Sequence, residues 1–431
     1  MPFRQLPQFS RTFVITVAAV LAAPAILAAT YPPEAEYWQL LRSRYEASSE
    51  NYAEALLEEF PVFEGIYPNF AGNDSLTYLK ATLYEIRKDE PAALATYLKL
   101  LHVYPASPLA GSAREKLKAL AESRKRGITA IFTDDSYELL KTHVLRLLAE
   151  NRTFAGGQQG YFDFLQLAAD AGNRELAAYL IADCRHYLYR ANYDYRAAEV
   201  CVIMGDMQQL LTRWRNALLA YHTAEILEPF GKTVGPALLK AGQVYLGPLK
   251  NYEMARRTFG EVIAKQPAEL SAARASVLVS EVDEAEQNYG QAVIQLEDTA
   301  KRFPFPEIQM DAYGRIARLY LDNLADVDKA LGFYERIVSE FPGEPRTAEV
   351  LERIGKVHES RTKNYAAAVE AYSRVAEMFP ESPLAPSCLF RAGELAEDRL
   401  KDRGRATALF QKAASGYPES EAGKKAAKKL R

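Results

Sequence analysis

The sequence predicts an all-α protein, an α–α superhelix made of antiparallel helix pairs in two arrays. Three observations predict it. An alanine and a bulky apolar residue recur four positions apart, a proline follows each such alanine at a fixed distance, and these prolines recur at an almost constant spacing from Pro229 to Pro418. Residues i and i+4 share one face of a helix, and proline cannot continue a helix. Two helices per period of about 38 residues indicate a helical solenoid.

The second helix of each pair is clearest between Lys363 and Pro383. Ala368 is small enough to let a neighbouring helix approach, Tyr372 fills the space beside it, and Pro380 ends the segment. We expect both positions to pack the repeats throughout the chain. The equivalent pairs are Ala93 and Tyr97, Ala217 and Tyr221, Ala255 and Phe259, Ala292 and Leu296, Ala330 and Tyr334, and Ala406 and Phe410.

The first helix of each pair carries the same period. A small residue recurs once per repeat, and a bulky residue often follows it by three positions. The small residues are Gly242, Ser280, Ala317, Gly355 and Gly393, and the bulky ones are Tyr245, Tyr320 and His358. We expect these residues to pack the two helices of a repeat together.

These repeats resemble the tetratricopeptide repeat family, well over residues 193–420 and more loosely over 45–125. The endings YPASP at 104–108 and FPESP at 379–383 are similar to those of bacterial envelope members, such as the tetratricopeptide partner of the Tol–Pal system and a lipoprotein of the β-barrel assembly machinery. The resemblance implies an extended concave surface that holds protein or peptide partners. It implies no catalytic activity and no cofactor.

The start of the chain predicts a secretory signal peptide at residues 1–29. Arg4 and Arg11 precede an uncharged, largely apolar run from Thr12 to Ala29, which ends in small residues. A retained membrane anchor is the alternative, because the run is close to the ~20 residues that a membrane span needs. No cysteine lies near the expected cleavage site, so we do not expect a lipoprotein.

After the signal peptide, we expect helical repeats at 30–126, an irregular connector at 127–160, and a solenoid at 161–431 that ends in a basic capping helix. The connector lacks the period, although Tyr137–Glu150 is expected to form a helix within it. The glycine- and glutamine-rich stretch 151–162 is interpreted as a loop, and the short β-branched run Ile128–Phe132 as an extended segment. This loop is the expected break between the two arrays.

No constellation in the sequence predicts a catalytic, cofactor-binding or metal-binding site. The five histidines lack the spacing of a metal-binding helix, and the glycines at 156–160 are not followed by the Lys-Ser/Thr of a phosphate loop. A formal net charge of −3 argues against a general nucleic-acid binder. Cys184 and Cys201 flank a predicted turn and could form a disulfide, but buried, inert thiols are the favoured interpretation.

The resemblance and the signal peptide together imply an exported, periplasmic scaffold or adaptor, not an enzyme, that binds protein partners in cell-envelope assembly or maintenance. The alternative is an accessory component of a polysaccharide or protein export system. Membrane contact is expected only through an uncleaved N-terminus or the basic tail at 421–431, whose cations otherwise complement a helix C-terminus. The sequence marks neither the partner-binding residues nor the oligomeric state.

Overall fold

The protein is described here by a computed structural model that covers residues 31–46, 50–67, 69–122, 135–150, 154–190 and 194–430. Across these ranges the chain forms helices joined by short turns, and none of the covered residues lies in a strand. This confirms the all-α prediction. The expected signal peptide and the Ile128–Phe132 run lie outside the described residues. Within the described ranges no helix is long and apolar enough to cross a bilayer.

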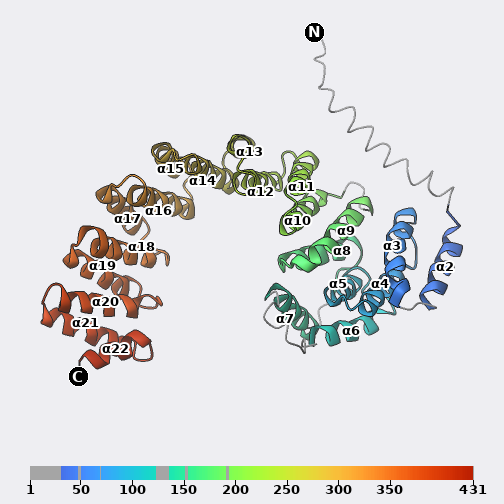
Figure 1. Ribbon diagram of the computed structural model, residues 1–431, viewed down its shortest axis with the longest axis horizontal. Coiled ribbons are helices and arrows are strands. Elements are labelled where there is room, and N and C mark those ends of the chain that lie inside the picture. The colour runs from blue at the N-terminus through green and yellow to red at the C-terminus, as the bar shows by residue number, and fades with distance from the viewer. Residues whose placement is uncertain are drawn as a thin grey trace, which may run out of the picture. The chain divides into compact units, whose positions relative to one another are not determined.

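The chain divides into two compact units, one up to Thr233 and one from Val234 onward. Most successive helices of the first unit are in contact with one another (Figure 1). They are α2 (Glu34–Glu46), α3 (Glu50–Ile66), α4 (Asn73–Ile86), α5 (Glu90–Val103), α6 (Ala110–Glu122), α7 (Asp135–Ala149), α8 (Gly157–Asp170), α9 (Arg174–Arg190), α10 (Ala197–Leu210) and α11 (Trp214–Leu227).

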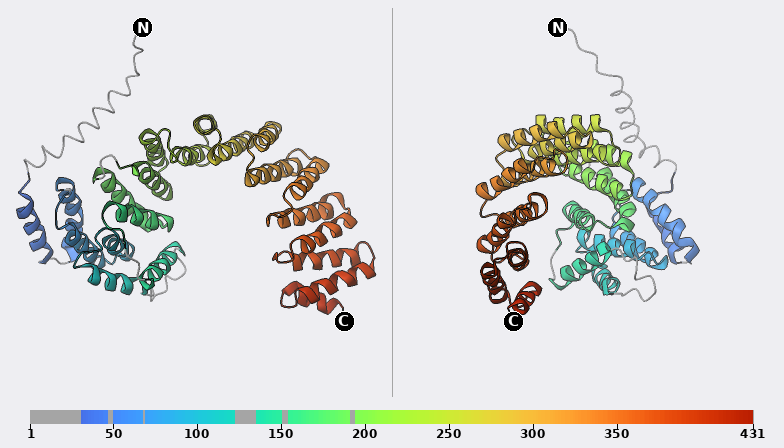
Figure 2. Two further views of the ribbon diagram at one scale, coloured as in Figure 1. Left: turned by 180° about the vertical axis from the view of Figure 1, so that it is seen from behind. Right: turned by 60° about the vertical axis from the view of Figure 1, so that its left-hand side comes forward.

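The second unit is a run of helix pairs in which each helix packs on the next (Figure 2). Its helices are α12 (Val234–Leu246), α13 (Tyr252–Lys265), α14 (Leu270–Ala285), α15 (Tyr289–Arg302), α16 (Pro306–Asp322), α17 (Val327–Glu340), α18 (Thr347–Val357) with the π-helical turn η2 (His358–Thr362), α19 (Tyr365–Met378), α20 (Ala385–Asp398), α21 (Arg403–Gly416) and α22 (Glu421–Lys429). Even-numbered helices are the first and odd-numbered helices the second of each pair.

A two-residue signal starts several of the second helices. An Asp or Asn caps the helix by accepting the N–H of the residue three positions on, as Asn364 does from Ala367 at 3.2 Å. The residue directly before the cap has a positive φ, as Lys363 does at 56°. The same left-handed residue and cap recur as Lys88 and Asp89, Lys250 and Asn251, Ala325 and Asp326, and Lys401 and Asp402. The sharp turn within a repeat is therefore encoded locally.

Much of the expected irregular connector is helical. Residues 135–149 form α7, and α8 begins at Gly157, so the interpretation of 151–162 as a loop is wrong from Gly157 onward. Tyr161 and Phe164 bury one face of α8 in the core that α5 also lines. Gly160 is required there, because a Cβ at this position would meet the backbone carbonyl of His102. The glycines that suggested a loop instead let α8 approach α5 closely.

The division between the units also differs from the expected break. Helix α5 packs on both α8 and α9, so residues on either side of 127–160 share one core. The compact units instead divide between Thr233 and Val234, in the turn that follows α11. A break in sequence periodicity is therefore not a break in packing here.

Candidate partner-binding surface

The structure buries most of the residues expected to pack the repeats. Those with side chains at most 3% exposed are Ala93, Tyr97, Ala217, Tyr221, Ala255, Phe259, Ala292, Leu296, Ala317, Ala330, Tyr334, Ala368, Tyr372, Ala406 and Phe410. Gly242, Gly355 and Gly393 are buried as well. Tyr245 and Tyr320 are only half-buried, so the residue three positions after the small one lies at the edge of the core.

The small residue of a first helix faces the bulky residue of the second helix. A Cβ added to Gly355 would lie 2.6 Å from the Tyr372 ring, and one added to Gly393 would lie 2.5 Å from the Phe410 ring. Gly242 faces Phe259 in the same way. The sequence interpretation paired Gly242 and Gly355 with residues on their own helices, whereas the contact joins the two helices of a pair. It also missed Gly205, which lies one period before Gly242 and faces Tyr221.

Ion pairs connect successive first helices in the second unit. A basic residue recurs once per repeat on the first helices. It usually pairs with a carboxylate of the preceding first helix or of the turn that extends that helix. The pairs are Arg315 with Glu284, Arg391 with Glu359, and Lys429 with Glu397. We call this series the basic ladder. Lys429 belongs to the basic tail, so part of that tail's charge is used within the structure.

One member of the basic ladder lacks its carboxylate. Arg353 lies one repeat after Arg315, but the residue one repeat after Glu284 is Leu321. Arg315 also pairs with Glu281, and the position that corresponds to Glu281 is Arg318. The two positions that supply glutamates to Arg315 are therefore a leucine and an arginine in the case of Arg353. Among the described residues, neither Arg318 nor Arg353 forms an ion pair, and both side chains are exposed.

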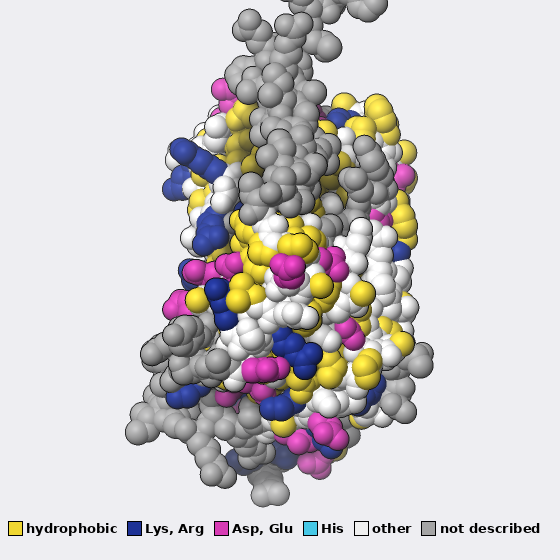
Figure 3. Space-filling model, turned by 90° about the vertical axis from the view of Figure 1, so that its right-hand side faces the viewer, with side chains coloured by type: hydrophobic (Ala, Val, Ile, Leu, Met, Phe, Trp, Pro, Cys, Tyr) yellow, Lys and Arg dark blue, Asp and Glu magenta, His cyan; other side chains and the backbone are white. Residues whose placement is uncertain are grey.

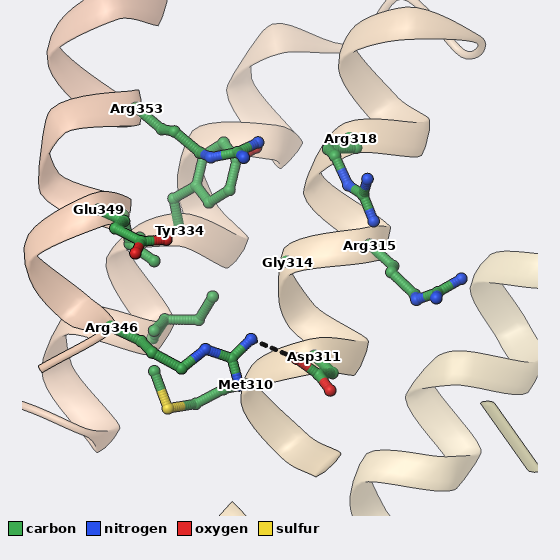
Figure 4. A pocket seen from close by; sticks show the side chains of 11 residues that line it. Met310, Asp311, Gly314, Arg315, Arg318, Tyr334, Arg346, Glu349 and Arg353 are labelled. Atoms are coloured by element: carbon green, nitrogen blue, oxygen red, sulfur yellow. Dashed lines mark hydrogen bonds and ion pairs between the residues drawn. The ribbon is translucent and has the colours of Figure 1, made fainter. Parts of the chain in front are cut away.

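A pocket of about 280 Å³ lies at this break in the ladder, between α16 and α18 (Figure 4). We call it the arginine pocket. Its lining includes four arginines, Arg315, Arg318, Arg346 and Arg353, against two carboxylates, Asp311 and Glu349. Arg346 pairs with Asp311, and the buried Tyr334 lines the inner side of the pocket. Figure 4 shows Arg353 extending from α18 towards α16, the helix on which Arg318 lies. The lining of the pocket thus carries more arginines than carboxylates.

Charge on the face shown in Figure 3 is mixed. On the side shown in Figure 3, acidic and basic side chains are interspersed among hydrophobic and neutral ones. Such a surface attracts no ligand by its overall sign.

The first unit contains a buried charged cluster that joins five helices. Lys99 of α5 pairs with Asp183 of α9, and both are nearly inaccessible to solvent. Tyr161 of α8 donates to Asp183 Oδ1 at 2.8 Å, and Lys80 of α4 pairs with Glu64 of α3 at 3.0 Å. The two cations balance the two anions, so the cluster connects the helices and leaves no net charge for a ligand.

Electrostatics keep the carboxylates of this cluster ionised. Burial alone would raise the pKa of Asp183, but Lys99 and Lys80 more than offset this, and the pKa lies below its usual value. Burial would likewise raise the pKa of Glu64, and Lys80 lowers it below the usual value. The stability from these groups is present above the unfolded-state pKa of a carboxyl and is lost as the pH falls through the lower folded-state pKa.

The cysteines and histidines form no recognisable reactive site. Cys184, Cys201 and Cys388 are free and buried, and burial raises the pKa of Cys201 and of Cys388 to about 12. Thiols of this kind are poor nucleophiles. Within the described part of the chain, no group of three or more His, Cys, Asp or Glu residues is arranged to hold a metal ion.

The fold is therefore that of a helical-repeat protein whose exposed features suit binding. The tetratricopeptide repeat family model matches residues 236–268, 311–343 and 349–382. Each match spans both helices of one pair, namely α12 and α13, α16 and α17, and α18 and α19. These three ranges thus match tetratricopeptide repeats, as the sequence indicated. Such repeats generally form non-catalytic scaffolds for protein–protein interaction.

Several solved structures are similar to this chain. The C-terminal part of a TPR repeat-containing protein from Cytophaga hutchinsonii is 14% identical, covers 63% of this chain and 99% of its own, and has a TM-score of 0.42. PilF of Pseudomonas aeruginosa is 15% identical over 54% and 98%, with a TM-score of 0.34. MamA from Desulfovibrio magneticus RS-1 is 17% identical over 42% and 93%, with a TM-score of 0.33. No curated protein matches this chain.

Proposed function

We propose that this protein is a non-catalytic, periplasmic scaffold that binds protein partners in cell-envelope assembly or maintenance. We further propose that the arginine pocket receives acidic side chains of a partner. The observation that carries the binding proposal is the break in the basic ladder, where Arg353 lacks the carboxylates that the equivalent Arg315 and Arg391 have, and where Arg318 stands in place of Glu281. The tetratricopeptide repeats support a scaffold, and the apolar N-terminal sequence supports export.

The chemistry of the pocket favours a carboxylate-rich segment. A guanidinium presents a planar set of donors that fits a carboxylate with two parallel hydrogen bonds. Arg318 and Arg353 come from neighbouring helices, so an extended segment that spans α16 and α18 could place one carboxylate against each. Because both side chains are exposed, the attraction should weaken as salt is added.

A pull-down from the organism's own envelope fraction tests the proposal. The bait would be the wild-type protein, the Arg318→Glu/Arg353→Glu variant, or an Arg257→Glu/Arg302→Glu control. The control reverses the charge of two exposed arginines on the second helices α13 and α15. The pocket variant and the control therefore have the same net charge. We expect the wild type and the control to recover the same partners, and the pocket variant to lose them. Equal recovery by all three would overturn the role of the pocket.

The identity of the recovered proteins separates the two cellular roles. Components of outer-membrane assembly or of the Tol–Pal system would support a scaffold for envelope assembly. A polysaccharide or protein export complex would replace that role with the accessory role in export. Processing of the N-terminus, read by sequencing the protein purified from its host, tests export directly: an intact Arg4–Ala29 segment would contradict a free periplasmic protein.

A further inference from the structure

The outer face of α11 is unusually apolar. Leu219, Ile226 and Leu227 are 64%, 65% and 51% exposed, and Phe230 in the following turn is 91% exposed. The opposite face of the same helix carries Ala217, Tyr221 and Ala224 into the core. The helix is thus apolar on two sides, and only one of them is covered by α10.

The repeats themselves provide the comparison. The residues equivalent to Leu219 on the next helices are Arg257, Ile294, Gly332, Glu370 and Ala408; those equivalent to Ile226 are Ala264, Lys301, Ser339, Glu377 and Ser415; and those equivalent to Phe230 are Ala268, Phe305, Gly343, Glu381 and Glu419. No other second helix in this series combines large apolar residues at these three positions. Exposure at these positions is ordinary for the fold, whereas the apolar side chains of α11 are not.

We propose that this face of α11 pairs with the same face of a second copy, with the two helices antiparallel. Arg215, Leu219 and Ile226 are spaced by four and seven positions and lie on one face of the helix. In an antiparallel pair with its two-fold axis near His222 and Thr223, Leu219 of one copy lies against Ile226 of the other. The contact is self-complementary, as a two-fold interface requires.

The charges on α11 select this orientation. Arg213 and Arg215 are exposed at the beginning of the helix, and Glu225 and Glu228 lie near its end. Antiparallel pairing brings Arg215 of one copy beside Phe230 and Glu228 of the other, where a cation–π contact and an ion pair can form. Parallel pairing would place like charges together. The two glutamates also make the patch a poor match for anionic lipid.

Sedimentation velocity of the purified full chain tests the proposal. We expect the wild type to be a dimer and Leu219→Glu to be a monomer. Ile294→Glu is the matched control, because Ile294 occupies the equivalent position on α15 and is 60% exposed. That control should remain a dimer. A monomeric wild type, or a dimer that survives Leu219→Glu, would overturn the proposal.

Three further measurements fix the orientation and the kind of partner. Thr223→Cys should give a disulfide-linked dimer under mild oxidation, whereas Ser339→Cys on the outer side of α17 should not, since only residue 223 lies near the axis. Arg215→Glu should weaken the dimer, and adding Glu228→Arg should restore it. A wild-type monomer that floats with phosphatidylglycerol vesicles would show that the patch binds lipid and would contradict the pairing.

Discussion

At the scale of single residues, the repeat depends on one contact between a small residue and a ring. Gly355 leaves room for the Tyr372 ring, and the hydroxyl of Tyr372 donates to Glu359 at 3.1 Å. Both the glycine and the tyrosine could be predicted from their spacing. Their mutual contact could not, because periodicity along one helix does not identify the residue that it meets on the next.

Removing either side of this contact should destabilise the second unit. Tyr372→Ala should lower the free energy of unfolding by about 3–5 kcal/mol, because a large buried side chain leaves a cavity. Gly355→Ala should cost about 1–3 kcal/mol, because the new methyl group overlaps the ring. Urea denaturation followed by circular dichroism measures both changes.

Gly332→Ala is the control for these substitutions. Gly332 lies inside α17 with open space where a Cβ would be placed, so alanine should stabilise the helix by about 0.5–1 kcal/mol. An unchanged midpoint for Tyr372→Ala, or equal effects for Gly355→Ala and Gly332→Ala, would contradict the packing described here.

His102 should make the stability of the first unit depend on pH. Burial lowers the pKa of His102 to about 4, although Asp163 acts in the opposite direction, and Nε2 has no hydrogen-bond partner. The neutral form is therefore favoured in the folded state. The stability that depends on the neutral His102 ring is fully present above the unfolded-state pKa of about 6.5 and is lost as the pH falls towards 4.

The His102→Phe variant tests this dependence, because the ring already lies 4.3 Å from the ring of Phe154. Between pH 7.5 and pH 5, the wild type should lose about 2 kcal/mol more stability than the variant. Denaturation curves at the two pH values measure the difference. The same loss in both proteins would mean that His102 is not the titrating group.

At the scale of elements, the binding site that we propose depends on a break in the basic ladder. The recurrence of Arg315, Arg353, Arg391 and Lys429 is visible in the sequence, as is Leu321 at the position of a glutamate. The sequence interpretation missed the basic ladder because it considered only the spacing of apolar residues. The role of a charged residue on a helix surface can be assigned only when its neighbour on the next helix is known. Only the structure places these residues across adjacent first helices.

Restoring the missing carboxylate should close the arginine pocket to acidic ligands. In Leu321→Glu, the new side chain can pair with Arg353 as Glu284 pairs with Arg315. A fluorescein-labelled hexaglutamate peptide, titrated at low salt, should bind this variant about tenfold more weakly than Leu321→Gln. The glutamine variant matches the glutamate in shape and in lost packing, so equal affinities would refute the role of the missing carboxylate.

At the scale of the whole molecule, the fold class and the period could be predicted from local sequence, but the division into units could not. Tyr161 and Phe164 follow a glycine-rich stretch that suggests a loop, yet they are buried in the core shared with α5. Whether a helix packs on residues far away in the chain depends on three-dimensional neighbours that the period does not reveal.

Limited proteolysis tests this division. A site-specific cut introduced between Glu228 and Thr233 should release two fragments that each keep a cooperative unfolding transition. A cut introduced at 154–156 should instead destabilise the first unit, because α8 and α5 share one core. Two stable fragments from the second cut would support the break at 127–160 that the sequence suggested.

The central claim is that a protein partner occupies the arginine pocket. Photo-crosslinking in the native host tests it most directly, with the crosslinking amino acid in place of Glu349 in the pocket or of Arg257 on α13. We predict a discrete adduct from position 349, none from position 257, and loss of the adduct in the Arg318→Glu/Arg353→Glu background. Absence of an adduct at position 349, or an adduct that survives the charge reversal, would contradict the claim.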